Sequence, residues 1–336
     1  MRPGIQSEMD TTARAAWSAI ADADDLGLRL REDTVTEGVL LRLARRVPDL
    51  ILHRFNQMSE KSSGGDWEWF VGSQRAGWIA FRIQAKRMDG FQYLQLDHEG
   101  LLPGEKQYDT LIRDSAAGTV PTFPFHVFFN GWSGGWPSSI AWNACPNGRV
   151  FTLCKHHEET DMGCSLAPSA AVRILHRSGG AKRLRVETYL PHSVPWSWLF
   201  GPPLGSGGTR RTGPSSLVTL LAWHERMAQM LAGGAPRGVS MGEGSLPQEL
   251  VRWWITQLQQ GSPKPEREPA HDLPDYAAWA LHTELIRRRV RERAEPETAD
   301  GWKAYFSDEV YRQSDNQLPT FASPSGLDGL LFTPLP

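Results

Sequence analysis

GGDWEWF at residues 64–70, followed by WIAFRIQAKR at residues 78–87, is the part of the sequence that decides the fold. Side chains in a β-strand alternate between its two faces. Asp66 and Glu68 therefore share one face of the first run. In the second run the polar side chains on one face are Arg82, Gln84 and Lys86, and the apolar ones opposite are Ile79, Phe81, Ile83 and Ala85. Pairing of the two runs as a hairpin would gather acids, an amide and an ammonium on one face. This arrangement is suited to holding a divalent metal ion and activating water.

The composition is that of a globular protein without a dominant charge. The chain has 336 residues, of which 40% are hydrophobic and 22% are charged, and its formal net charge is −2. This balance excludes a wholly disordered chain. It also gives no global basic surface, so any contact with nucleic acid has to come from local patches. The length predicts one domain with large additions, or two domains.

The cysteine count and the hydropathy pattern predict a cytoplasmic protein with no membrane segment. Three cysteines, an odd number in a long chain, argue against a disulfide framework and for a reducing compartment. The first residues contain no apolar signal-peptide core. No run of about 18 apolar residues is present.

A cluster of cysteines and histidines raises the question of zinc. Its members are Cys145, Cys154, His156, His157 and Cys164. Their spacing does not match a finger or ribbon pattern, so structural zinc is not predicted. Buried free cysteines and polar loop histidines are the favoured interpretation.

Periodicity predicts the order helix, strand, strand, helix, strand over residues 34–130. The first helix carries an apolar stripe made by Val39, Leu40, Leu43, Val47 and Leu50. The hairpin follows, then a helix over 107–118 and a buried strand over 125–129. A short helix is expected earlier, at 13–20. We also expect helices starting near Pro168 and at 216–231, 247–259 and 275–296, separated by loops.

Several sequence words resemble those of an uncharacterised bacterial family. They are REDTVTEGVLLRL (31–43), DWEWF (66–70), IQAKR (83–87), PFHVFFNG (124–131) and MGCSLAP (162–168). The resemblance spans roughly residues 31–170 and keeps the words in order. That family in turn is similar to the PD-(D/E)xK nuclease superfamily, in the variant where glutamine replaces the second acid, as in Mrr-like type IV restriction enzymes.

The resemblance implies an α/β fold with a restriction-endonuclease-like core, in which a central mixed sheet is flanked by helices. It implies a nuclease domain over 1–170 and a mainly helical, loop-rich accessory region over 171–336. Asp66, Gln84 and the Ala85 carbonyl would hold Mg²⁺ or Mn²⁺. Lys86 would be the catalytic lysine, and Glu37 the acid on the preceding helix.

Further residues are candidates with specific alternatives. Glu68 shares the face of Asp66, but it can instead pair with Arg82. Glu60 is a second additional acid, whose alternative is a loop or helix-end charge. Basic side chains that would contact nucleic acid are Arg87, Arg288 and Arg291, with a solvated helix face as the alternative for the last two.

The function implied by the resemblance is that of a Mg²⁺-dependent endonuclease in bacterial defence against phage or foreign DNA. The implied partner is nucleic acid, with DNA favoured over RNA. A homodimer and a sensor or defence-system partner protein are both compatible with the class. The alternative is a catalytically silent protein of the nuclease fold that binds or assembles, or an effector subunit of a multi-protein defence complex. The glutamine at position 84 keeps this alternative open.

Overall fold

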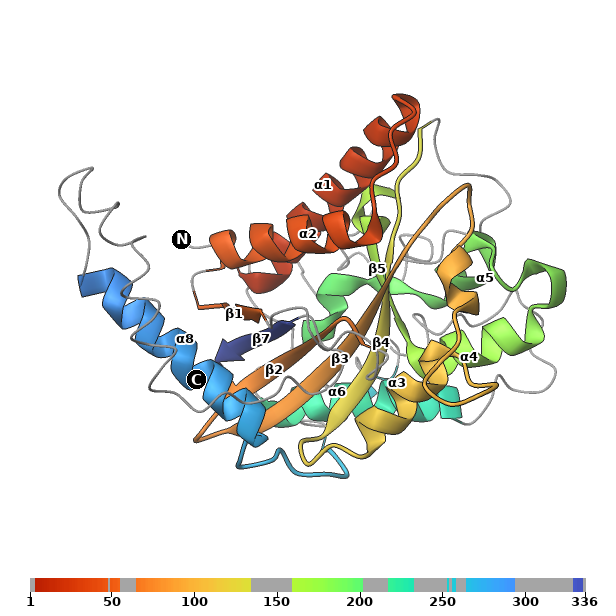
Figure 1. The fold of residues 1–336 in the computed structure, drawn as a ribbon. Helices are drawn as coiled ribbons and strands as arrows, with labels where there is room; N and C mark the ends of the chain where they lie inside the picture. Colours follow the sequence, from red (N-terminus) through yellow and green to blue (C-terminus); the bar gives the residue numbers. More distant parts are fainter. Residues whose placement is uncertain are drawn as a thin grey trace, which may run out of the picture.

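The structure is a computed structural model of the chain. It describes residues 4–47, 49–54, 65–133, 159–201, 217–232, 253, 256–257, 264–293 and 329–334. Within these residues the fold is mixed α/β, with a seven-stranded mixed sheet flanked by helices (Figure 1). No helix in the described ranges is both long and apolar enough to cross a bilayer.

The sheet has the strand order β1-β7-β2-β3-β4-β5-β6. The strands are β1 (Ile51–Arg54), β2 (Trp67–Ser73), β3 (Gly77–Arg87), β4 (Thr122–Phe129), β5 (Cys164–Pro168), β6 (Val194–Pro195) and β7 (Gly329–Pro334). The β2–β3 and β4–β5 pairs are antiparallel, whereas β3–β4 and β2–β7 are parallel. Strands β6 and β7 belong to this sheet although they lie beyond residue 170, so the sheet draws on both predicted parts of the chain.

Helices cover both faces of the sheet. The α-helices are α1 (Ile5–Asp25), α2 (Glu32–Arg46), α3 (Gln107–Ala116), α4 (Ser169–Ser178), α5 (Val186–Tyr189), α6 (Leu217–Ala232) and α8 (Asp275–Arg293). The short 3₁₀ helices are η1 (Leu94–Asp97), η2 (Glu159–Gly163), η3 (Gly180–Lys182), η4 (Leu190–His192) and η5 (Trp196–Phe200). The elements α2, β2, β3, α3 and β4 are those predicted over residues 34–130, but the order misses β1, a strand at Ile51–Arg54 between α2 and β2. The predicted helix at 13–20 is part of the longer α1.

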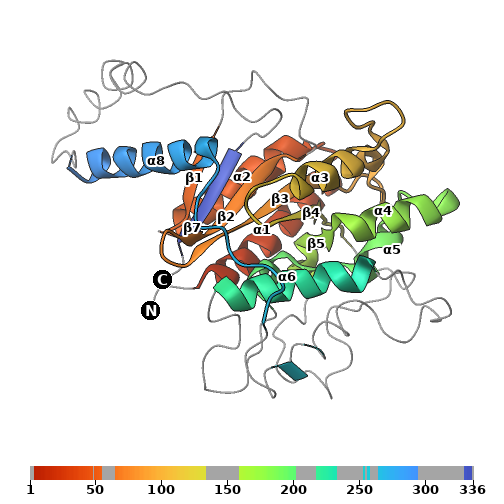
Figure 2. The same ribbon diagram turned by 90° about the horizontal axis from the view of Figure 1, so that it is seen from below.

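The alternation predicted for the hairpin is present. In β2 and β3, Trp67 and Phe81 belong to a core formed with α1, α2 and α6. On the opposite face, Phe70 packs against α8. Farther along this opposite face, Phe128 of β4 packs against α3, α4 and α5. Figure 1 shows α1 and α2 on one side of the sheet and α8 beside β1 and β7; Figure 2 shows α3 and α4 together near β4 and β5.

Candidate functional site

The first component of the site is Asp66, at the point where β2 joins the sheet. Its backbone N–H donates to the carbonyl of Ile83 (2.8 Å), which is the register partner of Trp67, so the chain leaves the regular β2–β3 pairing at Asp66. Its carboxylate then accepts a hydrogen bond from the Ala85 backbone N–H (2.5 Å to Oδ2). A Cβ on the preceding Gly65 would come within 2.9 Å of Arg82 Cγ. A larger residue there would therefore displace the chain just before Asp66.

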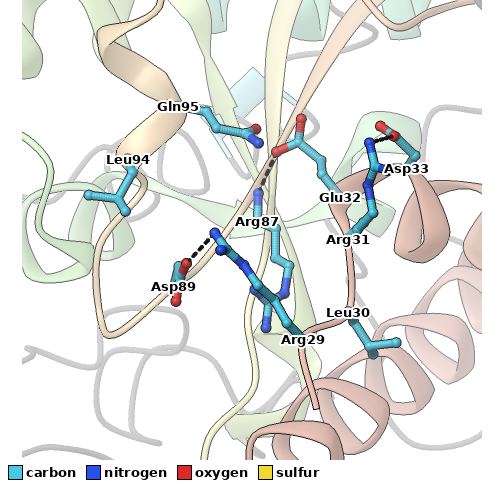
Figure 3. Close-up of a pocket in the computed structure, with 9 residues that line it drawn as sticks. All are labelled: Arg29, Leu30, Arg31, Glu32, Asp33, Arg87, Asp89, Leu94 and Gln95. Carbon is cyan, nitrogen blue, oxygen red and sulfur yellow. Dashed lines mark hydrogen bonds and ion pairs between the residues drawn. The ribbon is translucent and has the colours of Figure 1, made fainter. Parts of the chain in front are cut away.

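The second component is Glu32, the first residue of α2. Strand β3 extends beyond the start of β2, and Glu32 Oε2 accepts from the Arg87 N–H on this overhang (2.8 Å). Glu32 Oε1 lies 3.6 Å from Lys86 Nζ. The Gln95 amide, with its nitrogen turned toward Glu32, donates to the same carboxylate (2.8 Å to Oε1). Figure 3 shows Glu32 between Gln95 and the Arg87 backbone.

Asp66 and Glu32 thus occupy the same edge of β3. The amides that they bind belong to residues 85 and 87, which are separated by about 7 Å along a strand. Lys86 lies between these two positions, and only 3% of it is exposed. Two carboxylates and one buried ammonium are therefore fixed by the backbone of a single strand.

Lys86 is the electrostatic centre of the site. Burial raises the pKa of Asp66 to about 6, against the opposing effect of the Lys86 ammonium, and the Glu32 carboxylate raises it further. Burial likewise raises the pKa of Glu32, which Lys86 and the Arg87 N–H partly offset. Burial and then Lys86 lower the pKa of His98 and, much more strongly, that of His126. The Lys86 ammonium therefore lowers the pKa of two carboxyl groups and two imidazoles of the site.

Gln84 and His126 are two further buried polar residues of the site, on β3 and β4. They are register partners on β3 and β4. Gln84 Nε2 donates to Gln107 Oε1 at the start of α3 (2.9 Å), and His126 Nδ1 lies 2.9 Å from Ser169 Oγ at the start of α4. The remaining polar atoms, Gln84 Oε1 and His126 Nε2, are buried and have no hydrogen-bond partner among the described residues. Such atoms are uncommon in folded proteins and call for an explanation.

With the geometry established, comparison with known families gives one match. The model of a family of unknown function, DUF6615, matches residues 5–309. The chain belongs to the DUF6615 family. Comparison with curated proteins finds no significant match. The matched span includes Glu32, Asp66, Gln84 and Lys86, so the site lies within the part of the chain that defines the DUF6615 match.

The helix acid at the site of this DUF6615 protein is Glu32 rather than Glu37. Glu37 is exposed, whereas Val35 and Val39 of the same helix are buried. Five residues separate the two acids, so they point roughly 140° apart around α2. The apolar stripe could have indicated Glu32, which precedes Val39 by seven residues and therefore shares its side of the helix.

Glu68 pairs with Arg82, which was the alternative to a place beside Asp66 in the site. Its Oε1 accepts from Arg82 Nε (2.8 Å) and Oε2 accepts from the Tyr276 hydroxyl (2.6 Å). These contacts tie the start of β2 to β3 and α8. Glu60, the other additional candidate, lies outside the described residues.

The three arginines that were predicted to contact nucleic acid differ in their surroundings. Arg87 is buried and its guanidinium pairs with Asp24 on α1 (3.0 Å). Arg288 donates to the Leu50 backbone carbonyl. Arg291 lies on α8, and its side chain lies outside the described part of the structure. Arg87 and Arg288 therefore already make contacts within the protein.

The question of zinc falls mostly outside the described part of the chain. Cys164 is buried on β5 with a free thiol, and burial raises its pKa well above the usual value. The other four members, Cys145, Cys154, His156 and His157, lie outside the described residues. Among the described residues no group of three or more His, Cys, Asp or Glu side chains is arranged to hold a metal ion.

A cavity opens beside the Glu32 end of the site. Its volume is about 410 Å³, and its lining residues include Arg29, Arg31, Glu32 and Gln95 (Figure 3). Arg29 pairs with Asp89 (2.8 Å) and Arg31 pairs with Asp33 (3.3 Å), and the side chains of both arginines are about 80% exposed. Exposed pairs of this kind contribute little stability. The two guanidinium groups are therefore available to an anionic ligand at low cost.

The raised pKa of Asp66 predicts a pH-dependent effect of Asp66→Asn on the metal-free protein. A carboxyl whose pKa rises from 3.8 to about 6 on folding stabilises the fold below pH 3.8 and loses that contribution as the pH rises through 6. Asp66→Asn removes the cost of the buried charge. In EDTA it should raise the free energy of unfolding by on the order of 1–3 kcal/mol at pH 8. The gain should be small near pH 4.5.

Urea unfolding of wild type and Asp66→Asn at pH 4.5, 6, 7 and 8 checks this prediction. Asp89→Asn serves as the control, because Asp89 pairs with an exposed arginine outside the β3 edge. A gain of equal size at every pH would contradict the assignment of the effect to Asp66 ionisation.

Proposed function

We propose that this protein is a metal-dependent nuclease with a restriction-endonuclease-like core that hydrolyses phosphodiester bonds of nucleic acid. The observation that carries the proposal is the β3 edge, where Asp66 and Glu32 bind the amides of residues 85 and 87 on either side of Lys86. An acid, a glutamine two residues before a lysine, and a helix acid all meet there. We further propose bacterial defence in the cytoplasm as the setting, with DNA as the preferred substrate.

The residues present fit a divalent metal ion. Asp66 offers a carboxylate and Gln84 offers a buried Oε1 that lacks a partner among the described residues. Ala85 follows Gln84 in the chain and its N–H binds the Asp66 carboxylate, so its backbone carbonyl is a further oxygen beside both. Hard divalent cations prefer oxygen ligands of these kinds. When bound, such an ion would polarise the phosphate and lower the pKa of a coordinated water.

The chain's own groups would supply the remaining requirements. In hydrolysis the water oxygen bonds to phosphorus, the bond to the leaving sugar oxygen breaks, and negative charge builds on the phosphoryl oxygens. Lys86 offers a buried ammonium that can stabilise this charge in a site of low polarity. Glu32 holds the Lys86 ammonium at 3.6 Å and so positions it. Asp66 needs to be ionised to hold a cation, so binding should weaken below about pH 6.

The cavity beside Glu32 gives the substrate an approach. Its exposed guanidinium groups, Arg29 and Arg31, can exchange their aspartate partners for backbone phosphates. This local basic pair is compatible with a chain of net charge −2. Binding through few phosphates predicts a modest dependence of affinity on salt.

The proposal is tested by incubating the purified protein with duplex DNA, single-stranded DNA and RNA in Mn²⁺ or Mg²⁺, with EDTA as the negative control. Glu32→Gln should lower the cleavage rate about 10- to 100-fold, because Lys86 loses the carboxylate that orients it. Glu37→Gln, the matched change on the exposed side of α2, should leave the rate unchanged.

The outcomes separate the proposal from a catalytically silent protein of the same fold. Metal-dependent cleavage lost in Glu32→Gln and kept in Glu37→Gln supports a nuclease built on the β3 edge. Binding of metal and nucleic acid without cleavage in any of these conditions would instead identify a silent binding protein. Cleavage that persists in EDTA would contradict the metal-dependent chemistry.

A further inference from the structure

Three side chains form a row across neighbouring strands at the site. Asp66 lies just before the last ladder pair of β2 and β3, Trp67–Ile83, and its carboxylate accepts from the N–H of Ala85, the residue after Gln84. On the other side of β3, Gln84 is the register partner of His126. Neighbouring strands are about 4.8 Å apart. Asp66 at the edge of β3 is therefore followed by Gln84 and His126, which share one face on β3 and β4.

The row contains two buried polar atoms that the described residues leave without a partner. Gln84 is 2% exposed and His126 is fully buried, yet Gln84 Oε1 and His126 Nε2 accept or donate no hydrogen bond there. Leaving a buried polar atom unpaired costs roughly 1–3 kcal/mol. The two atoms belong to register partners, so one bound ligand would satisfy both.

The other ends of the same side chains are fixed. Gln107 binds the Gln84 amide nitrogen, which leaves the oxygen as the accepting end. Ser169 contacts His126 Nδ1. A histidine that ligates a metal usually donates its other ring N–H to a nearby oxygen, which sets the tautomer and the ring orientation. Ser169 Oγ is placed to accept this bond.

The contacts of His126 suit a cation, because Nδ1 is held by Ser169 and Nε2 is the buried ring nitrogen that the described residues leave without a partner. With Nδ1–H donated to Ser169, Nε2 presents a lone pair. A neutral imidazole adds a nitrogen donor to the carboxylate and amide oxygens of the row without adding repulsion.

We propose that His126 Nε2 is a further ligand of the divalent ion held by Asp66 and Gln84, and that the site consequently prefers Mn²⁺ over Mg²⁺ and Ca²⁺. This inference rests on the proposed function, because it concerns the same ion. An imidazole ligand favours transition-metal ions, whereas Mg²⁺ and Ca²⁺ are bound mainly through oxygen. Ser169 is then a positioning residue that holds the imidazole.

The test measures Mn²⁺ binding rather than activity. Binding is followed by the loss of the free-ion electron paramagnetic resonance signal, and pulsed measurements on the bound ion detect coupling to a coordinated nitrogen. Wild type should show coupling to one histidine nitrogen, confirmed by its change on ¹⁵N-histidine labelling. His126→Gln should abolish the coupling and weaken Mn²⁺ binding about 10-fold or more, with little change for Mg²⁺.

Two further variants complete the design. Ser169→Ala should keep the nitrogen coupling but weaken Mn²⁺ binding about 10-fold, because the ring loses its orienting contact. His271→Gln, at an exposed histidine far along the chain, should behave as wild type. If His126→Gln fails to fold, the wild-type spectrum and Ser169→Ala still decide the question.

The outcomes distinguish failure of this inference from failure of the proposed function. Mn²⁺ that binds to wild type and is lost in Asp66→Ala, but shows no histidine nitrogen, overturns the role of His126 and leaves the nuclease site intact. Mn²⁺ binding that is indifferent to Asp66→Ala overturns the proposed metal site itself.

Discussion

Asp66→Ala and Lys86→Ala should each lower the rate of nucleic-acid cleavage by about 10³-fold or more while leaving the fold intact. In the proposed site Asp66 would supply the carboxylate for the metal and Lys86 the buried ammonium at the β3 edge. Alanine offers neither charge, and the other acid at this edge, Glu32, is held by the Arg87 N–H. The rates are measured under single-turnover conditions with a saturating divalent ion.

The two variants should differ in metal binding, which separates their roles. Asp66→Ala removes a ligand and should weaken Mn²⁺ binding strongly. Lys86→Ala removes a positive charge that repels a cation but also lowers the pKa of Asp66 and Glu32, so at a pH where Asp66 is ionised in both proteins Mn²⁺ should bind at least as tightly as to wild type. Lys182→Ala, at a lysine whose side chain is 74% exposed, is the control. Cleavage that survives both Asp66→Ala and Lys86→Ala would sink the nuclease assignment.

Local periodicity was sufficient to predict the centre of the fold. In β2 and β3 one face is apolar and packs on the main core, so a shift of register by one residue would turn Arg82, Gln84 and Lys86 into that core. The pattern therefore specifies both the strands and the side on which Asp66, Gln84 and Lys86 lie. The helices α3 and α6 were predictable for the same reason, since each carries a stretch of regular apolar spacing.

Long-range pairing was not predictable in the same way. Strand β7 comes from residues 329–334 and inserts between β1 and β2. Its sequence, GLLFTP, is short and apolar and has no period that identifies a partner. Strand β5, at Cys164–Pro168, lies in a segment that reads as a polar loop because it follows charged and histidine-rich residues. In both cases the neighbour in the sheet, rather than the local sequence, determines the structure.

The candidate site also combines residues that the local sequence identifies with residues that long-range contacts bring to it. Asp66, Gln84 and Lys86 could be predicted because all three lie on one hairpin. Glu32 and His126 reach the site from other elements, so their contribution depends on helix placement and on the β3–β4 register. His126 did leave a signal, since it is the one polar residue in the run FPFHVFF at 123–129. A single histidine in an otherwise apolar strand has to find a partner or a ligand when it is buried.

Glu68→Ala should destabilise the protein by about 3–5 kcal/mol, the largest stability loss that we expect from a single change. Glu68 is 1% exposed, and it binds Arg82 and the Tyr276 hydroxyl. Burial raises the pKa of that hydroxyl, so it remains a protonated donor. The substitution would leave the Arg82 cation and this hydroxyl buried without their acceptor.

Urea unfolding of a graded series measures this effect and separates structure from catalysis. Tyr276→Phe removes one donor to a charged acceptor and should cost about 1.5–3 kcal/mol. Glu187→Ala breaks an ion pair with exposed Lys182 and should cost less than about 1 kcal/mol. At a temperature where Glu68→Ala is still folded, its Mn²⁺ affinity should equal that of wild type, because Arg82 and Tyr276 already occupy both carboxylate oxygens. A Glu68→Ala variant of normal stability that has lost Mn²⁺ binding would instead place Glu68 in the metal site beside Asp66.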